Sequence, residues 1–460
     1  MSKNVLLAVS ILMILISGLL FFQWNTVSIS TFSSGKKPEQ NVAVRHMQNH
    51  FQVKQSIKQM PEGSYEIRKP KKLDSFSCES SRHQSCVWLN QEKTRIAFGK
   101  EEEITFTYQL SSAENRDHFV LDNWLFQVED VTCHFSRIQL TEEKWRQGEW
   151  LAAADSIGKK KMDAIDYYVF ETNHESPALY WNANRLQEIY KDQHVAIYSE
   201  SSVPADFSKL KDLDRSGKLL AVMTKKEKKF HDHDDLILVP NQGEEAILLA
   251  ILKKTLLMEE KQEWLLDVMI SAFFERPFGS EKAQKMYLEL ERELQKDGVN
   301  RWLAKVLPSK TVISARDLDE YIWETAGIKT NFFTINAQEK KPFIPYYVLD
   351  ERPVLVNGKA ADEITILYHG EHPYISFIPL VAQLGFAVQS GTNEVMIKRG
   401  DGAYHFYYGR KIFYKNGRPF GLSGNPFLTV GEETYIRTEL LLPVLGVNIN
   451  ETSNQIHLKE

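Results

Sequence analysis

The stretch Tyr374-Ile-Ser-Phe-Ile-Pro-Leu-Val-Ala-Gln-Leu-Gly385 returns 61 positions later as Tyr435-Ile-Arg-Thr-Glu-Leu-Leu-Leu-Pro-Val-Leu-Gly446. Both copies open with Tyr-Ile and close with Leu-Gly. The same offset of 61 relates the segments 393–397 and 454–458. A fixed offset held over several motifs indicates an internal repeat. We therefore expect two similar structural units near the C-terminus.

Each unit predicts the same order of elements. Asn357-Gly358 and Asn416-Gly417, 59 positions apart, predict tight turns after a strand. The apolar run after each Tyr-Ile pair predicts a helix, which should end at Gly385 or Gly446 because glycine tolerates the left-handed conformation of a helix C-cap. A β-hairpin is expected to close each unit, at 387–397 and 447–458. Two such units sharing one core form a compact α+β domain, which we place at 346–460.

These residues resemble the copper amine oxidase N-terminal-like domain, or stalk domain, of exported proteins of Gram-positive bacteria. The resemblance rests on Val-Asn-Gly at 356–358, the Tyr-Ile pairs, the Pro-Leu-x-x-x-Leu-Gly run from Pro379 to Gly385 and the terminal hairpin. The second unit departs from this pattern, with Glu439-Leu440 where the first has Pro379, and with Pro443 further into the helix. The resemblance implies a non-catalytic module that positions or binds other components of the cell envelope.

The same region is rich in aromatic residues on predicted strands. They allow two interpretations: a face that contacts a ligand, or side chains of the hydrophobic core, which is the commoner role of strand aromatics. The residues concerned are Tyr407, Tyr408, Phe413, Tyr414 and Phe420.

The N-terminal segment predicts a membrane anchor. Val5–Phe22 carries no charged residue and is long enough, as a helix, to approach the thickness of the hydrocarbon layer. Phe21 to Trp24 follow instead of the small residues of a cleavage site, which favours an uncleaved anchor at residues 1–26. We expect a single pass through the cell membrane, a polar linker at 27–72, and the bulk of the chain outside the cytoplasm.

Residues 73–160 predict a β-rich, sandwich-like domain. Apolar residues alternate along the chain, as in Ile104-Thr-Phe-Thr-Tyr-Gln-Leu110, and alternation is typical of half-buried strands. Cys78 and Cys86 flank a short polar loop and are expected to form a disulfide in an oxidising compartment. Cys133 then remains as an unpaired thiol, for which no CxxC spacing suggests a reactive role.

Residues 161–335 predict a mixed α/β part followed by a helical part. Strands are expected at 166–171, 194–198 and 236–239, with a helix at 178–190 between the first two. Apolar residues at helical spacing then predict helices at 244–257, 263–274, 281–297, 300–306 and 315–326. Gly298 and Gly327 stand where C-caps are expected.

The order of elements in this part resembles the peptidase-MA-like, gluzincin-type metalloproteases. Trp264-Leu-Leu-Asp-Val268 has the form of the family's second zinc helix, with Asp267 at the position of its third zinc ligand. On the preceding helix, Leu252-Lys253-Lys254-Thr255-Leu256 replaces the His-Glu-x-x-His motif. A zinc site needs about three protein ligands, so the resemblance implies an inactive relative, a pseudoenzyme.

A separate metal-like cluster is His231-Asp-His-Asp-Asp235. Imidazole and carboxylate groups are ligands for divalent ions, and we take His231, His233 and Asp235 as the candidate set. The alternative is a charged loop, because lysines at 225–229 precede the cluster and balance its charge.

Composition and the absence of motifs limit the possible functions. The chain has 460 residues, 43% of them hydrophobic, and a formal net charge of −5, which excludes a disordered chain and gives no long-range attraction to nucleic acid. The sequence has no G-x-S-x-G elbow and no phosphate-binding glycine loop. We therefore expect a multidomain α+β envelope protein that binds a cell-wall or envelope partner without catalysis and without a cofactor. The alternative is a metal-dependent hydrolase that uses the His231–Asp235 cluster, with Asp267 as a further ligand.

Overall fold

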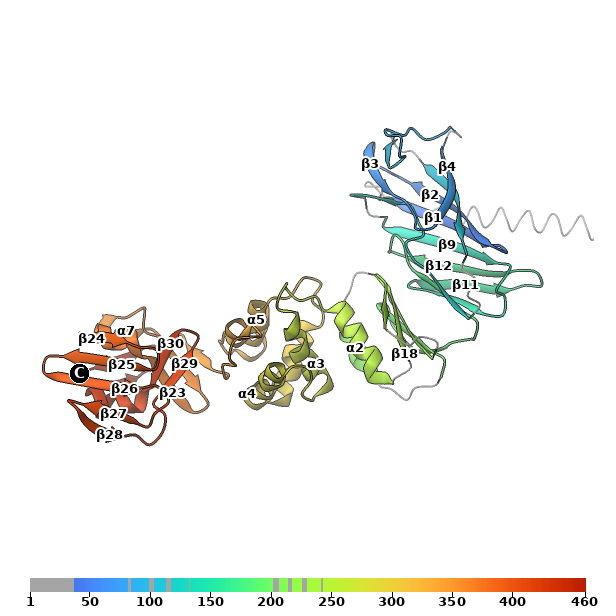
Figure 1. Cartoon of the computed structure of the whole chain (residues 1–460). Coiled ribbons are helices and arrows are strands. Elements are labelled where there is room, and N and C mark those ends of the chain that lie inside the picture. Colours follow the sequence, from blue (N-terminus) through green and yellow to red (C-terminus); the bar gives the residue numbers. More distant parts are fainter. Residues whose placement is uncertain are drawn as a thin grey trace, which may run out of the picture. The chain divides into compact units, whose positions relative to one another are not determined.

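The computed structural model describes residues 37–460 apart from 82–83, 99–102, 113–116, 132, 202–206, 214–216, 226–229 and 241–242. The chain forms two compact units (Figure 1): one ends at Arg185 and also includes His233–Asp235, and the other comprises Leu186–Asp232 and Leu236–Glu460. Among the described residues, no helix has both the length and the apolar character that a membrane crossing requires. The predicted anchor at Val5–Phe22 lies outside the described residues.

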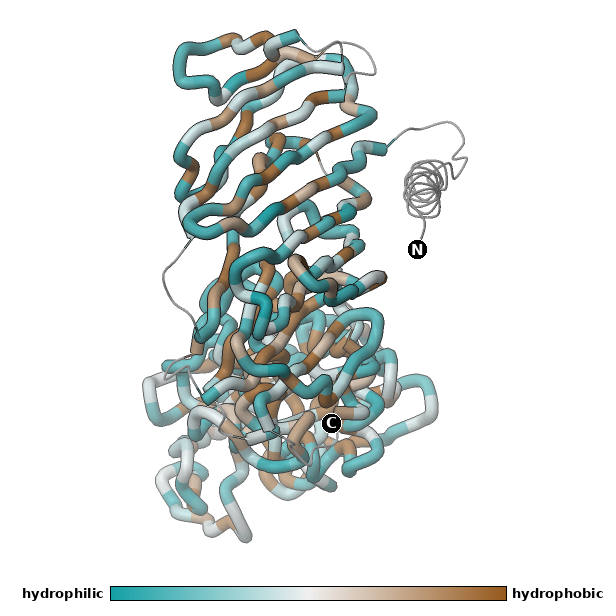
Figure 2. Tube along the Cα trace, turned by 90° about the vertical axis from the view of Figure 1, so that its right-hand side faces the viewer, coloured by the Kyte–Doolittle hydropathy of each residue, from teal (hydrophilic) through white to brown (hydrophobic). Residues whose placement is uncertain are grey.

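A seven-stranded sheet is the main element of the first unit. Along β1, β2, β6 and β9, every second residue is buried, because one face of the sheet covers the core. Figure 2 shows the same alternation of hydrophilic and hydrophobic positions along the strands. In order of pairing, the strands are β11 (Asp155–Lys161), β12 (Asp166–Thr172), β9 (Phe135–Glu142), β1 (Glu39–His46), β2 (His50–Lys58), β6 (Ile104–Ser111) and β4 (Leu73–Ser80).

The expectation of a linker at 27–72 is wrong for its described part, which contributes β1, β2 and β3 (Gly63–Arg68) to the sheets. Val42 and Val44 of β1 and Phe51 and Val53 of β2 are buried. Polar residues between them make the segment hydrophilic on average, but the apolar residues keep the period of two that a half-buried strand needs. The β-rich part therefore begins at Glu39, well before residue 73.

A three-stranded sheet packs on the large one and completes a two-layered core. The ring of Phe51 in β2 lies 5.6 Å from that of Phe119 and 5.9 Å from that of Trp150, between ring centroids. The small sheet consists of β10 (Glu149–Ala152), β13 (Leu179–Asn182) and β7 (His118–Leu121). A further sheet pairs β5 (Arg95–Phe98) with β3 and β3 with β8 (Gln127–Val128).

The helix predicted at 178–190 is wrong, because the segment forms β13 and the start of β14. All four residues of β13 are buried. A short apolar run of this kind fits either a helix or a strand covered on both faces. Its short length is typical of a strand and favours that assignment. The strand prediction at 166–171 is confirmed by β12.

The second unit begins with a five-stranded sheet in which β15, β16 and β18 run parallel. These strands are almost wholly buried, as expected for parallel strands covered on both faces. The order of pairing is β14 (Gln187–Lys191), β15 (Val195–Ser199), β16 (Leu219–Thr224), β18 (Leu236–Pro240) and β17 (His231–Asp232).

The helical part follows, and it differs from the prediction in several respects. Its helices are α2 (Glu244–Thr255), α3 (Leu266–Phe274), α4 (Glu281–Val306), α5 (Ala315–Ala326) and α6 (Phe332–Asn336). The segments predicted as separate helices at 281–297 and 300–306 both belong to α4, and the short helix α6 was not predicted. Gly327 ends α5 in a left-handed conformation, as predicted. Gly298 does not end a helix: α4 continues through it, and its irregular residue is Gln295, with φ of 58°. Gly298 is buried in α4, where a Cβ atom would lie 2.9 Å from that of Leu294.

The C-terminal part contains three sheets, and one of them joins the two repeat units. Its central strands, β23 and β30, pair antiparallel through the equivalent residues Ile375 and Ile436. The two repeat units are therefore related by an approximate two-fold axis that passes between these two isoleucines. The order of strands is β19 (Val348–Asp350), β22 (Ile366–His369), β23 (His372–Ser376), β30 (Glu433–Arg437) and β29 (Phe427–Val430).

The other two sheets repeat each other, with one extra strand. One has the order β21 (Lys359–Ala360), β20 (Val354–Val356), β32 (Ile456–Lys459) and β31 (Asn448–Glu451). The other has the order β28 (Arg418–Gly421), β27 (Ile412–Lys415), β26 (Gly402–Tyr407), β25 (Glu394–Arg399) and β24 (Ala387–Ser390). By the repeat, β28, β27, β25 and β24 correspond to β21, β20, β32 and β31. The connection between the units therefore supplies the extra strand, β26.

The caps and turns of the two units agree with prediction. Gly385 and Gly446 have φ of 80° and 74°, and the Asn357-Gly358 and Asn416-Gly417 turns have positive φ at both residues. The first unit has the helix α7 (Phe377–Gln383). The second has a 3-10 turn followed by a π turn at 438–445. Proline has no N–H to donate to a helical ladder, so Pro443 accounts for this irregular helix.

Candidate functional site

The three proposed metal ligands have separate surroundings. His231 lies exposed on β17 at the edge of its sheet. The Nδ1 atom of His233 is 3.6 Å from a carboxylate oxygen of Asp122, and this contact lowers the pKa of Asp122 to about 2. Asp235 is buried, and both its oxygens accept from the N–H of Ala178, at 3.0 and 3.1 Å. The described residues include no group of three or more His, Cys, Asp or Glu side chains placed to hold an ion.

The protease-like helices are closed by apolar packing where the resemblance would place zinc ligands. Leu252 and Leu256, at the positions of the two histidines, are 1% and 3% exposed and belong to the core of the second unit. Lys254 pairs with Asp232 at 2.7 Å. A pair of buried leucines offers no donor atoms to a metal ion.

The side chain of Asp267 stabilises the loop between α3 and α4. Its carboxylate accepts a hydrogen bond from the backbone of Ser280, the residue that caps α4, and burial raises its pKa. The preceding residue, Gly279, has φ of 81° and lies so close that a Cβ atom there would meet the Asp267 carboxylate at 2.1 Å. The position thus has a structural role in the loop between α3 and α4.

The cysteines form one disulfide and one inert thiol. Cys78 and Cys86 are joined, with their Cα atoms 5.5 Å apart, as predicted. Cys133 is free and buried, and its burial raises the pKa of the thiol to about 12. A thiol that stays protonated is a poor nucleophile and a poor metal ligand.

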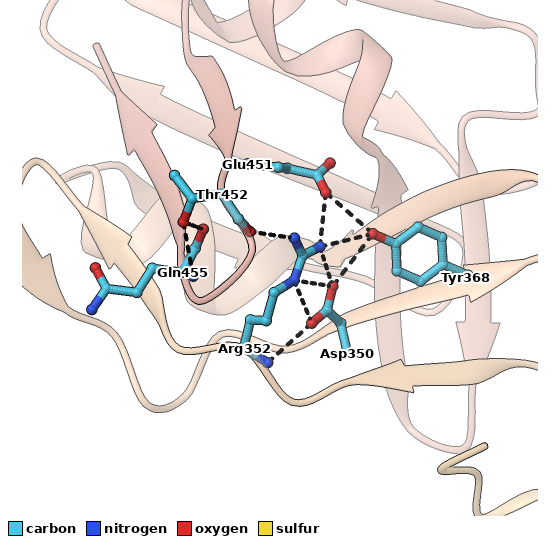
Figure 3. A network of polar contacts seen from close by, with 6 residues as sticks. All are labelled: Asp350, Arg352, Tyr368, Glu451, Thr452 and Gln455. Carbon is cyan, nitrogen blue, oxygen red and sulfur yellow. Dashed lines mark hydrogen bonds and ion pairs between the residues drawn. The ribbon is translucent and has the colours of Figure 1, made fainter. Parts of the chain in front are cut away.

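A polar network surrounds Arg352 at the start of the C-terminal domain (Figure 3). The guanidinium donates to the carboxylates of Asp350 (2.6 Å) and Glu451 (2.8 Å), to the carbonyl of Thr452 (2.8 Å) and to the hydroxyl of Tyr368 (3.1 Å). Burial alone would raise the pKa of Asp350, but its bonds with Arg352 hold that pKa below the ordinary value. The donors of Arg352 are used within the network, which joins the first strand of the domain to its last hairpin.

The outer face of the sheet formed by β24–β28 is the remaining candidate. The inward residues of its strands, Val395, Ile397, Phe406 and Phe413, are buried in the core. Successive residues alternate between faces, so their neighbours point outward. These side chains line a groove of about 500 Å³. We call six of them the aromatic face: Gln389, Met396, Lys398, His405, Tyr407 and Tyr414.

Strand pairing brings the aromatic face together from segments far apart in the sequence. Gln389 pairs with Met396, Met396 with His405, and His405 with Tyr414, which makes one row across four strands. The rings of Tyr407 and Tyr414 are 6.1 Å apart at 77° to each other. Met396 is 38% exposed, although its side chain is large and apolar.

Two contacts fix the position of Tyr407. The Nε2 atom of His405 is 2.9 Å from a carboxylate oxygen of Glu394, and its Nδ1 atom is 3.3 Å from the Tyr407 hydroxyl. With the proton assigned to Nε2, His405 donates to Glu394 and accepts from Tyr407. The guanidinium of Arg410 lies 5.0 Å from the centre of the Tyr407 ring. The ring is therefore held in place before any ligand arrives.

The five aromatic residues singled out in the sequence divide between the two interpretations. Tyr407 and Tyr414 line the groove. Phe413 is core, at 5% exposure, and Tyr408 packs half-buried against that core. Phe420 is exposed but stacks on Phe413, 5.4 Å away between ring centroids, in the inward register.

Sequence reasoning missed four members of the aromatic face. They are Gln389, Met396, Lys398 and His405. The signal was present as the alternation in Val395-Met-Ile-Lys398 and Tyr404-His-Phe-Tyr407. Reading those runs by period two places the outward residues on one side, whereas aromatic residues alone do not separate the two faces.

The comparisons with known proteins find distant similarities in structure. No protein-family model and no curated protein sequence matches the chain. A mutant M1 zinc metallopeptidase of Deinococcus radiodurans, bound to a Tyr-Ser-Ala substrate, has a TM-score of 0.43 and 9% identity over 67% of this chain and 95% of that one. A two-domain M1 zinc metallopeptidase mutant bound to L-tryptophan has a TM-score of 0.43 and 8% identity over 69% and 98% of the two chains. Nothing about the chemistry of this chain follows from similarities at this level.

Proposed function

We propose that the chain is a non-catalytic binding protein of the cell envelope, and that its partner contacts the aromatic face. The observation that carries this proposal is the groove across β24–β27, where Tyr407, Tyr414 and Met396 lie together and remain accessible. Tyrosine and methionine are enriched at binding surfaces, and exposed apolar patches of this kind mark interaction sites.

Two further features support an extracytoplasmic location. The disulfide between Cys78 and Cys86 is typical of proteins in oxidising compartments. The apolar segment Val5–Phe22 suits a single membrane anchor with the following residues on the outer side. The proposal keeps the C-terminal domain as a stalk-type module, and it assigns that module the contact with the partner.

Retention on cell-envelope material tests the proposal. The full chain, kept in mild detergent because Val5–Phe22 is apolar, is mixed with washed envelope fragments of the producing cell and sedimented. We expect the wild-type chain to sediment with the fragments and the double variant Tyr407→Ala/Tyr414→Ala to remain in solution. Phe420→Ala is the matched control, since it removes an exposed ring of the same sheet in the inward register. Equal sedimentation of wild type and double variant, or none of either, would contradict the proposal.

A further inference from the structure

The groove of the aromatic face lies across the face of a sheet and reaches its edge strand, β24. The remaining lining comes from β25, β26 and β27, whose backbone groups are paired with strands on both sides. A ligand over the rings of Tyr407 and Tyr414 cannot add itself as another strand there, because strand addition requires a free edge. Recognition at the rings therefore runs through side chains.

The size of the groove favours a slender ligand. Twelve residues line it, and its volume is about 500 Å³. Stable interfaces between folded proteins need roughly 20–30 residues on each side. A volume of several hundred Å³ is typical of sites for small molecules or for short lengths of a polymer.

The side chains of the groove combine ring faces with hydrogen-bonding groups. Tyr407 and Tyr414 offer flat apolar surfaces, and Met396 adds an apolar side chain beside them. His405 stands beside Tyr407, and Gln389 lines the groove on the outer strand β24; both carry polar atoms. The C–H faces of sugar rings pack on such surfaces, while their hydroxyls bond to neighbouring polar groups. This pairing of stacking and polar contact suits a carbohydrate chain.

The segment that forms this sheet carries a charge opposite to that of the whole protein. Residues 387–421 contain six basic and two acidic residues, a formal charge of +4, whereas the whole chain carries −5. Lys398 lines the groove and is exposed. Arg410 adds a second cation, with its guanidinium 5.0 Å from the centre of the Tyr407 ring. The acidic residue of this face, Glu394, is engaged by His405. A ligand that carries negative charge fits this arrangement.

The repeat supplies an internal comparison. In the equivalent sheet, β20 and β32 pair directly, and Leu355 lies opposite His457. The corresponding residues of the aromatic face, Tyr414 and Met396, are separated by His405 of β26. The extra strand therefore widens the face and adds His405 and Tyr407 to it. The groove is a feature of one half of the domain and is not required by the repeated fold.

We propose that the aromatic face binds an acidic polysaccharide, with sugar rings on Tyr407 and Tyr414 and anionic groups at Lys398 and Arg410. This inference rests on the proposed function and names the chemistry of the partner. Carboxylate or phosphodiester groups would meet the same two cations, so the test includes one oligomer of each kind. Single-stranded nucleic acid also combines rings with negative charge, and the test includes it as the contrary outcome.

The test measures dissociation constants of the full chain for defined oligomers by calorimetry. The probes are hexagalacturonate, an oligo(glycerol phosphate) that carries sugar substituents, neutral cellohexaose, and a thymidine hexanucleotide. We expect one of the acidic oligomers to bind at least about tenfold more tightly than cellohexaose, and more tightly than the hexanucleotide. Raising the salt concentration should weaken this binding, since exposed charges are screened.

Three variants locate the site. Tyr407→Ala/Tyr414→Ala should weaken binding of the acidic oligomer by about tenfold or more, as loss of stacking does elsewhere. Lys398→Glu, on an exposed side chain, should weaken it more at low than at high salt. Phe420→Ala should leave it within about twofold of wild type. Because Lys398→Glu removes no apolar packing, it tests the site even if the double tyrosine variant folds poorly.

Several results would overturn the inference. They are equal binding of cellohexaose and both acidic oligomers, tightest binding of the hexanucleotide, no binding of any acidic oligomer, and acidic-oligomer binding that neither the tyrosine nor the lysine variant weakens. If envelope retention still depends on Tyr407 and Tyr414 while no acidic oligomer binds, the polysaccharide class is wrong and the proposed function stands. If acidic oligomers bind but envelope fragments do not, the proposed function fails instead.

Discussion

The helices α2 and α3 and the aromatic face of β24–β28 lie in the same compact unit but differ in how they use side chains. Where the metalloprotease resemblance calls for zinc ligands, Leu252 and Leu256 are buried in the core. On the aromatic face, Tyr407, Tyr414 and Met396 stay accessible, although each is apolar enough to be buried. In the helices, apolar side chains pack in the core. On the aromatic face, side chains remain accessible to a ligand.

The difference shows why fold and function must be argued separately. A helical arrangement does not need ligand residues on its inner side, because leucine at those positions stabilises the packing. A sheet persists when its outer residues change, because only the inner face is needed for the core. Function therefore has to be inferred from the accessible groups, and the aromatic face brings several of them together in one groove.

The largest effect is expected from opening the closed region. Leu252→Ala removes a fully buried side chain from the core of the second unit and should lower the free energy of unfolding by about 2–5 kcal/mol. Leu442→Ala is the matched control, since Leu442 is 55% exposed, and it should change the value by less than about 0.5 kcal/mol. Urea unfolding followed by tryptophan fluorescence measures both. A small effect of Leu252→Ala would mean that this region is not the packed core described above.

A buried carboxyl group provides a second test of the packed helical part. Asp319 on α5 accepts from the N–H groups of Phe333 (2.8 Å) and Thr334 (2.9 Å) at the start of α6, and burial raises its pKa to about 7. The folded state then holds a proton that the unfolded state releases near pH 4, so stability should fall as pH rises from about 4 to 7, by up to a few kcal/mol. Asp319→Asn should flatten this dependence in urea unfolding across that range. A parallel pH profile in the variant would show that another group is responsible.

The disulfide provides the next effect, in the first unit. Cys78 and Cys86 are 8 residues apart, so their bond closes a short loop. The chain-entropy estimate for a loop of this length is about 2–3 kcal/mol. Replacing both cysteines by serine should lower the stability of the first unit by that amount and leave oligomer binding unchanged. A variant that unfolds as late as wild type would show that neighbouring strands hold the loop without the bond.

The smallest effect on stability is expected on the aromatic face. Tyr414→Ala removes a half-buried outward ring and should change the free energy of unfolding by less than about 1 kcal/mol, although it weakens ligand binding. Measuring the free energy of unfolding and the dissociation constant on the same preparation distinguishes a role in ligand contact from a role in core packing. If the change in stability matched that of Leu252→Ala, the aromatic face would belong to the core, and the comparison would fail.

Patterns that depend on local periodicity were predictable from the sequence, and contacts between distant segments were not. The repeat, the Asn-Gly turns, the caps at Gly385 and Gly446 and most helices followed from spacing. The strands within residues 39–68 were not predicted, because polar residues outnumber apolar residues in this segment and make it hydrophilic on average. The helix expected at 178–190 failed because a short apolar run fits either type of element.

The candidate site was only partly predictable. Tyr407 and Tyr414 were noticed as aromatic residues, but the row from Gln389 to Tyr414 depends on the register of four strands, which no single segment encodes. The cluster at His231–Asp235 shows the reverse error. Its residues are close in sequence, yet His233 and Asp235 have partners, Asp122 and Ala178, that lie 57 or more positions away.

The strand β26 has a consequence for the history of the C-terminal domain. Two halves that meet through equivalent isoleucines have the architecture of a symmetric pair of chains fused after gene duplication. Before fusion, both sheets of such a pair would have had the order of β21-β20-β32-β31, because no connection was needed. The connection became β26, and with it came His405 and Tyr407. The aromatic face is on this account younger than the fold, and its outward residues can change without altering the buried core.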